Sequence, residues 1–102
     1  MTFFNFWQDL QVKLKGGENI RNWTAAKGYI GDEFKIVGIS DDCVEVKSPN
    51  AKTIQYAKKY DFEVMFNNWK PYCSRKLQRQ ELVEQTRVSK YTMSIIKHLE
   101  ML

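Results

Sequence analysis

The spacing of the apolar residues changes twice along this chain, and this change limits the folds open to it more than any other feature. Near the N-terminus, five apolar residues recur at the spacing of one helix face: Phe3, Phe6, Trp7, Leu10 and Leu14. Between residues 33 and 48, apolar and polar residues alternate as they do in half-buried strands. Helical spacing returns from residue 62 onward. The order predicts an α+β domain.

In the N-terminal half, turn residues mark where the expected elements end. Gly16-Gly17 stops the first helix, and a short helical turn is expected over residues 19–27. The alternating runs 33–40 and 43–48 meet at Asp41-Asp42, which predicts a β-hairpin.

The second half is expected to add one strand and then helices. Residues 53–59 read as a third strand, Asp61 is placed to cap the next helix, and Pro71 closes it. Two further helical segments follow. The expected architecture is an N-terminal amphipathic helix, a small antiparallel sheet of about three strands, and C-terminal helices packed on one face, all in a single domain over residues 1–102.

Composition argues against several classes of protein. The chain has one histidine, His98, and two cysteines, Cys43 and Cys73, so no metal-finger spacing and no disulfide framework is present; whether the two cysteines pair is left open. We expect no metal, no cofactor and no membrane-spanning segment, and a non-enzymatic protein is favoured. The N-terminus lacks the basic start of a signal peptide, so the expected location is the cytoplasm.

Positive charge collects in the second half of the chain. Residues 1–50 hold six Lys or Arg against seven Asp or Glu, a balance of −1, whereas residues 51–102 hold ten against five, a balance of +5. Within the second half, basic residues alternate with aromatic rings between Tyr56 and Arg79. Basic side chains neutralise phosphates, and exposed rings stack on unpaired bases. Tyr60 and Tyr72 are the rings expected at the surface, since Trp69 shares a helical face with core residues.

Residues 81–99 form two apolar-periodic segments joined by a short polar turn that begins at Thr86. This stretch resembles helix-turn-helix DNA-binding modules, in which the second helix lies in the major groove. On that pattern Leu82 and Val83 are buried in the first helix, Ser89 caps the second, and Met93 and Ile96 form its buried side.

The apolar residues of this stretch are equally expected from a helical hairpin over residues 80–99 that covers the sheet with Leu82, Val88, Met93, Ile96 and Leu99. The resemblance, by contrast, implies a small regulatory DNA-binding protein. Its expected DNA-contacting residues are Arg75, Lys76, Arg79, Arg87, Lys90, Tyr91, Ser94 and Lys97. Such modules usually pair two recognition helices roughly 34 Å apart, so double-stranded DNA and a homodimer are the implied partners.

Two other functions remain open. The chain is also similar in style to small bacterial α+β proteins from mobile gene cassettes, and apolar residues on more than one side of the first helix, Phe4 among them, favour self-association or a partner protein. The less favoured function is a metal-dependent nuclease, because Asp32 with Glu45 and Lys47 resembles the acidic residue and Glu-x-Lys pair of restriction-endonuclease folds.

Overall fold

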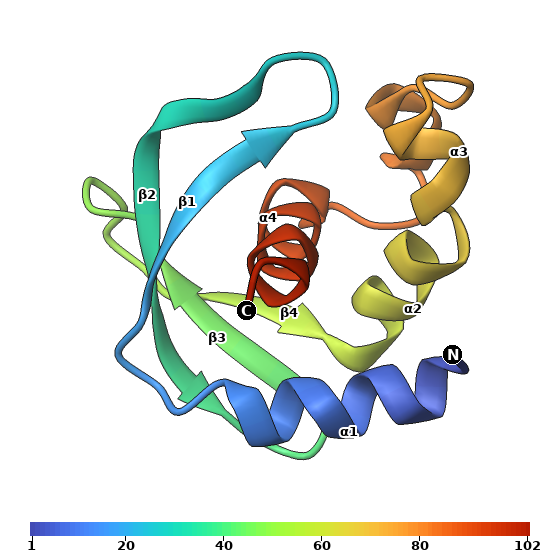
Figure 1. Ribbon diagram of the computed structural model, residues 1–102. Coiled ribbons are helices and arrows are strands. Elements are labelled where there is room, and N and C mark those ends of the chain that lie inside the picture. Colours follow the sequence, from blue (N-terminus) through green and yellow to red (C-terminus); the bar gives the residue numbers. More distant parts are fainter.

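A four-stranded antiparallel sheet curls around the C-terminal helix and forms the framework of the molecule (Figure 1). The structure, a computed structural model, describes residues 1–102 throughout. In chain order the elements are α1 (Phe3–Lys13), β1 (Asn19–Thr24), β2 (Gly28–Ile39), β3 (Cys43–Lys47), β4 (Gln55–Lys58), α2 (Lys59–Asn67), α3 (Trp69–Cys73), the 3-10 turn η1 (Arg79–Leu82) and α4 (Ser89–Glu100). The predicted α+β class is confirmed.

The sheet is a meander in which each strand pairs with the next, in the order β1-β2-β3-β4. Buried residues lie opposite one another across each pair: Ile20 and Phe34, Ile36 and Val46, Val44 and Ala57. Alternation along each strand therefore turns one face of the sheet to the helices. The register shifts once in β1–β2 and once in β2–β3, and irregularities of this kind increase the bend of a sheet.

Helix α4 lies in the hollow of the sheet, where Figure 1 shows it almost end-on. Seven of its twelve residues are buried, and Met93 and Ile95 are fully so. The Ser94 hydroxyl accepts a hydrogen bond from the backbone N–H of Trp23 and donates one to the Lys90 carbonyl, both at 3.0 Å. A small, hydrogen-bonded side chain lets the helix approach β1 closely.

Helix α1 closes one end of the core and follows the sequence expectation closely. The Thr2 hydroxyl caps it by accepting from the Asn5 N–H at 3.2 Å. The chain then leaves the helix through Gly16 and Gly17, whose φ angles of 90° and 92° favour glycine. The Gly17 N–H donates to the Ile36 carbonyl at 2.7 Å, so this turn is bonded directly to β2.

The helical turn predicted over residues 19–27 is wrong, because this stretch contains strand β1. Ile20 is buried opposite Phe34, and pairing with β2 outweighs a local pattern that also fits one turn of helix. The sheet consequently has four strands, one more than expected, and the predicted third strand is β4.

The boundaries of α2 and α3 also differ from the prediction. Helix α2 begins at Lys59, and Asp61 caps it from within its first turn by accepting from the Lys58 N–H at 2.9 Å. Pro71 does not close α2, which ends at Asn67; it lies in the first turn of α3, where a missing N–H costs little. No helix combines the length and apolar character that crossing a membrane requires.

Candidate nucleic-acid interface

The net positive charge of the chain is concentrated in residues 70–90, called here the basic segment. It holds six Lys or Arg and two Glu, whereas the rest of the chain holds ten residues of each sign. Its cations are Lys70, Arg75, Lys76, Arg79, Arg87 and Lys90, of which five are exposed and Lys90 is half-buried. The only ion pair in the structure joins Lys97 to Glu100, so none of the six cations is held by a carboxylate.

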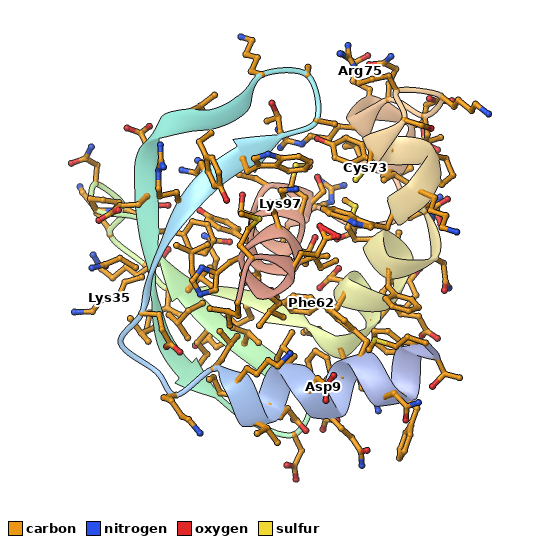
Figure 2. The ribbon with its side chains drawn as sticks, viewed as in Figure 1. Asp9, Lys35, Phe62, Cys73, Arg75 and Lys97 are labelled. Atoms are coloured by element: carbon orange, nitrogen blue, oxygen red, sulfur yellow. The ribbon has the colours of Figure 1, made fainter.

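The basic segment forms one end of the molecule, beside the tip of the β1–β2 hairpin (Figures 1 and 2). The buried Tyr72 hydroxyl joins the basic segment to the hairpin, because it accepts from the Ala25 N–H at 3.1 Å. It also donates to the Met93 sulfur of α4 at 3.1 Å. Lys27, exposed in the hairpin turn, adds a cation on this side. The sequence reasoning missed Lys27, which only the folded hairpin brings near residue 72.

Two further hydrogen bonds hold the later half of the basic segment against the core. The Thr86 hydroxyl donates to the Asp61 carboxylate at 2.7 Å, and the Arg79 Nε donates to the Ser89 hydroxyl at 3.1 Å. The backbone of the segment is therefore anchored at both ends while most of its charged groups stay in solvent.

Arg75 has an unusual backbone conformation. With φ of 68°, it is the one non-glycine residue of the structure in the left-handed region. It follows Ser74, the C-cap of α3, at the position where helices favour glycine because a side chain there carries a steric cost. The position instead carries a long cationic side chain at the outer end of the basic segment (Figure 2).

The first helix of the predicted helix-turn-helix is not formed. Residues 79–82 make the short 3-10 turn η1, and residues 83–88 are turn and loop. Leu82 is buried as predicted, but Val83 is 46% exposed. Ser89 is the first residue of α4 rather than its N-cap, a position that Val88 occupies. Leu82 is the only buried apolar residue of this stretch, and one such residue is too little to pack an α-helix against the core.

The α4 face expected to meet DNA is turned toward the sheet. Its predicted residues are Lys90, Tyr91, Ser94 and Lys97. Ser94 is only 1% exposed, and the Tyr91 ring packs edge-on against Phe34 with centroids 4.9 Å apart. The Lys97 ammonium lies 5.0 Å from the centre of the Trp23 ring. These four residues do not form one exposed face, because Ser94 is buried and the other three are half-buried.

The residues of the nuclease alternative do not come together. Glu45 lies opposite Gly38, six positions along β2 from Asp32, a separation of about 20 Å. The Glu45 carboxylate instead folds over Gly38, where an added Cβ would lie 2.7 Å from its Oε2. No cluster of three or more His, Cys, Asp or Glu side chains that could hold a metal ion occurs in the structure.

Both cysteines are free thiols. Burial raises the pKa of Cys73, and the nearby Glu100 carboxylate raises it further. Burial likewise raises the pKa of Cys43, with Glu45 as the next contribution. The reactive thiolate is therefore disfavoured at both positions, and neither environment activates a nucleophile.

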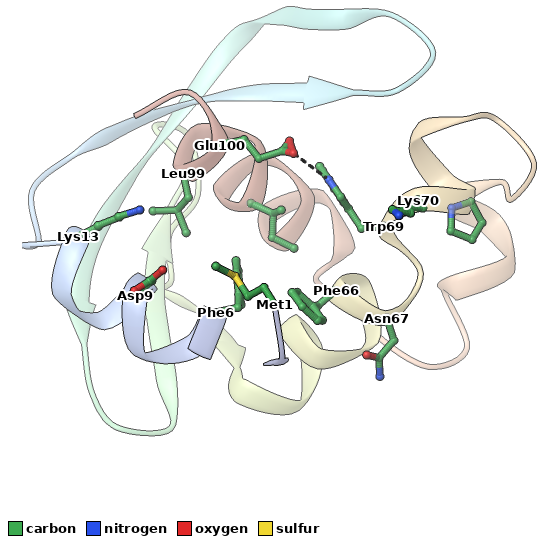
Figure 3. A pocket seen from close by; sticks show the side chains of 12 residues that line it. Met1, Phe6, Asp9, Lys13, Phe66, Asn67, Trp69, Lys70, Leu99 and Glu100 are labelled. Carbon is green, nitrogen blue, oxygen red and sulfur yellow. Dashed lines mark hydrogen bonds between the residues drawn. The ribbon is translucent and has the colours of Figure 1, made fainter. Parts of the chain in front are cut away.

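A second surface feature, an apolar groove, was not predicted from the sequence. It has a volume of about 670 Å³ and lies between α1, the α2–α3 corner and the last turn of α4 (Figure 3). Trp69 lines it, although the sequence places Trp69 in the core, whereas the expected surface residue Tyr72 is buried. No local pattern marks the groove, because its walls come from segments far apart in the chain.

In comparisons with known proteins, no protein family, curated protein or solved structure matches the chain.

Proposed function

We propose that the protein is a small DNA-binding protein that holds the phosphate backbone through its basic segment. The observation that carries this proposal is the concentration of the chain's entire net charge in residues 70–90, where five of the six cations are exposed and none has an ion-pair partner. Each Lys or Arg that neutralises a phosphate releases counterions from the DNA, and this release supplies most of the affinity of non-specific binding.

Arg75 and the hairpin turn support the same assignment. An arginine in the left-handed region costs stability that glycine would avoid, and a use for its charge would offset this cost. Lys27 adds an exposed cation in the hairpin turn that Ala25 joins to Tyr72. Because α4 is in the core, the proposed contacts go to the backbone and carry little base specificity. A cytoplasmic location fits the two free cysteines and gives access to DNA.

The proposal is tested by removing two cations without harming the fold. The double variant Arg75→Gly with Lys76→Ala should lower affinity for a fluorescently labelled duplex about tenfold in an anisotropy titration at about 50 mM salt. Its free energy of unfolding should not fall, since glycine relieves the strain at position 75.

A matched control removes two exposed lysines elsewhere. Lys15→Ala with Lys52→Ala makes the same change in net charge outside the basic segment and should alter the affinity much less. Equal losses for the two double variants would mean that the net charge acts without a defined site, and the basic segment would lose its assigned role.

We also propose that the protein self-associates through α1. Phe6 and Trp7 are buried and Phe3 is half-buried, but Phe4 and Val12 are 63% and 66% exposed. They lie two turns apart on the outer side of α1. In an antiparallel pair of α1 helices with the twofold axis at Gln8, Phe4 of each copy meets Val12 of the other, so the surface is complementary to itself.

Sedimentation velocity at increasing concentration tests this dimer. The wild-type protein should approach a dimer, and Phe4→Gln with Val12→Gln should remain a monomer because the apolar contacts are lost. Val37→Gln with Val83→Gln, which changes two exposed valines outside α1, should behave as wild type. A wild-type protein that stays monomeric throughout the range contradicts the proposed pairing.

A further inference from the structure

The apolar groove joins the basic segment at one edge. Its apolar lining consists of Met1, Phe6, Phe66, Trp69, Ile96 and Leu99, together with Pro71. Lys70 belongs to both the groove and the basic segment, at the end of the groove marked by Trp69 (Figure 3). A DNA strand held by Arg75 and Lys76 would therefore pass the mouth of the groove at Lys70.

The lining is suited to a flat ring. The rings of Phe6 and Phe66 lie with centroids 5.1 Å apart, and the Trp69 ring forms the wall next to Lys70. The volume of about 670 Å³ lies within the range of roughly 300–1,000 Å³ that is typical of sites for small organic groups. Aromatic walls at this scale hold planar groups by stacking.

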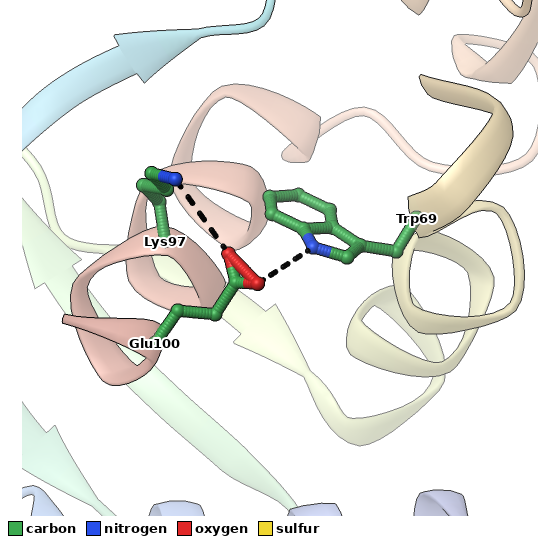
Figure 4. Close-up of polar contacts among 3 residues, drawn as sticks. All are labelled: Trp69, Lys97 and Glu100. Carbon is green, nitrogen blue, oxygen red and sulfur yellow. Dashed lines mark hydrogen bonds and ion pairs between the residues drawn. The ribbon is translucent and has the colours of Figure 1, made fainter. Parts of the chain in front are cut away.

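The position of Trp69 is fixed by its polar contacts. Its indole N–H donates to the Glu100 Oε2 at 3.3 Å, while the Lys97 ammonium lies 3.9 Å from the Glu100 Oε1 (Figure 4). The Trp69 ring also packs against Trp23, with centroids 5.7 Å apart. The ring is therefore held in place before any ligand binds, which lowers the entropic cost of stacking on it.

The charges of the groove favour a neutral occupant. Asp9 and Glu100 contribute two carboxylates, and Lys13 and Lys70 two ammonium groups, so the four charges cancel. A phosphate gains little inside such a groove, whereas a neutral ring gains burial and stacking. The phosphates of the same strand are attracted to Lys70 at the mouth and to the basic segment beyond it.

We infer that the groove binds an unpaired base of the DNA held by the basic segment, with the base stacked beside Trp69 and its phosphate at Lys70. This inference rests on the proposed function. Bases in a duplex are already stacked, so the groove selects single-stranded or locally opened DNA. Base–aromatic stacking contributes about 1–3 kcal/mol, which corresponds to roughly 5-fold to 150-fold in affinity.

Abasic strands separate this inference from backbone binding. Anisotropy titrations compare a single strand of about 12 nucleotides with the same strand carrying abasic sites, which keeps every phosphate. The intact strand should bind about 5-fold to 150-fold more tightly. Equal affinities for the two strands would overturn the groove inference and leave backbone binding in place. If neither these strands nor duplex DNA bind at about 50 mM salt, the proposed function fails as well.

A variant locates the base. Trp69→Leu should bind intact and abasic strands equally, with the affinity that the wild-type protein has for the abasic strand. Tyr56→Leu removes an exposed ring outside the groove and should keep the full discrimination. Circular dichroism checks that both variants are folded. Discrimination that persists in folded Trp69→Leu would mean that the base binds elsewhere, and the comparison of strands stands even if this variant does not fold.

Discussion

Ser94→Arg is expected to lower the free energy of unfolding by about 4 kcal/mol or more. Ser94 is 1% exposed between α4 and β1, and its hydroxyl satisfies the backbone N–H of Trp23. The substitution forces a charged side chain into this contact and leaves that N–H without a partner. Urea unfolding followed by circular dichroism measures the loss.

Gln85→Arg provides the control, because it adds the same side chain at an exposed position of the basic segment. Its effect on stability should lie within about 0.5 kcal/mol. In a helix-turn-helix arrangement Ser94 would face solvent, and Ser94→Arg would be tolerated and would strengthen DNA binding. That result would contradict the placement of α4 in the core.

Phe62→Ala is expected to lower the free energy of unfolding by about 3–5 kcal/mol. Phe62 is fully buried at the start of α2, and its ring lies 5.4 Å from that of Trp7 in α1. Truncation removes this contact and leaves a cavity that the surrounding helices and sheet fill only in part. A domain of this size has a total stability of only about 5–15 kcal/mol, so the variant should be partly unfolded at 37 °C.

Tyr60→Ala in the same helix is the matched control, since Tyr60 is 59% exposed. It should change the unfolding free energy by less than about 1 kcal/mol. Similar losses for the two variants in thermal or urea unfolding would show that α2 does not pack against α1 as described.

The elements that could be predicted from sequence are those whose signals are local. Helix α1 has a clear apolar period and a pair of glycines that stop it, and the β2–β3 hairpin alternates around Asp41-Asp42. Strand β1 could not be recognised, because its identity depends on pairing with β2. Ile20 and Trp23 alone fit one turn of helix as well as they fit a strand.

In α4, polar residues that a sequence pattern assigns to the surface are in contact with the core. Tyr91 and Lys97 read as surface residues, yet the Tyr91 hydroxyl shares a hydrogen bond of 2.9 Å with the Ser48 hydroxyl. The ammonium group of Lys97 lies over the Trp23 ring. Such contacts join residues more than forty positions apart, so a local sequence pattern cannot predict them.

The two parts of the candidate site differ in the same way. The basic segment is visible in the sequence because its six cations lie within 21 consecutive residues, and five of the six are exposed in the fold. The groove combines α1, the corner of α2 and α3, and the end of α4, so only the folded chain defines it. Lys70 belongs to both the basic segment and the groove. In the proposed complex, a DNA strand contacts the basic segment first, then Lys70, and then places a base in the groove.

The salt dependence of duplex binding tests the central claim most directly. If six phosphates are neutralised, the logarithm of the association constant should fall against the logarithm of salt concentration with a slope of about −5. Arg75→Gly with Lys76→Ala should make this slope shallower by about 2, while Lys15→Ala with Lys52→Ala should leave it unchanged. An identical slope for the wild type and the basic-segment variant, or no binding at about 50 mM salt, would contradict the account.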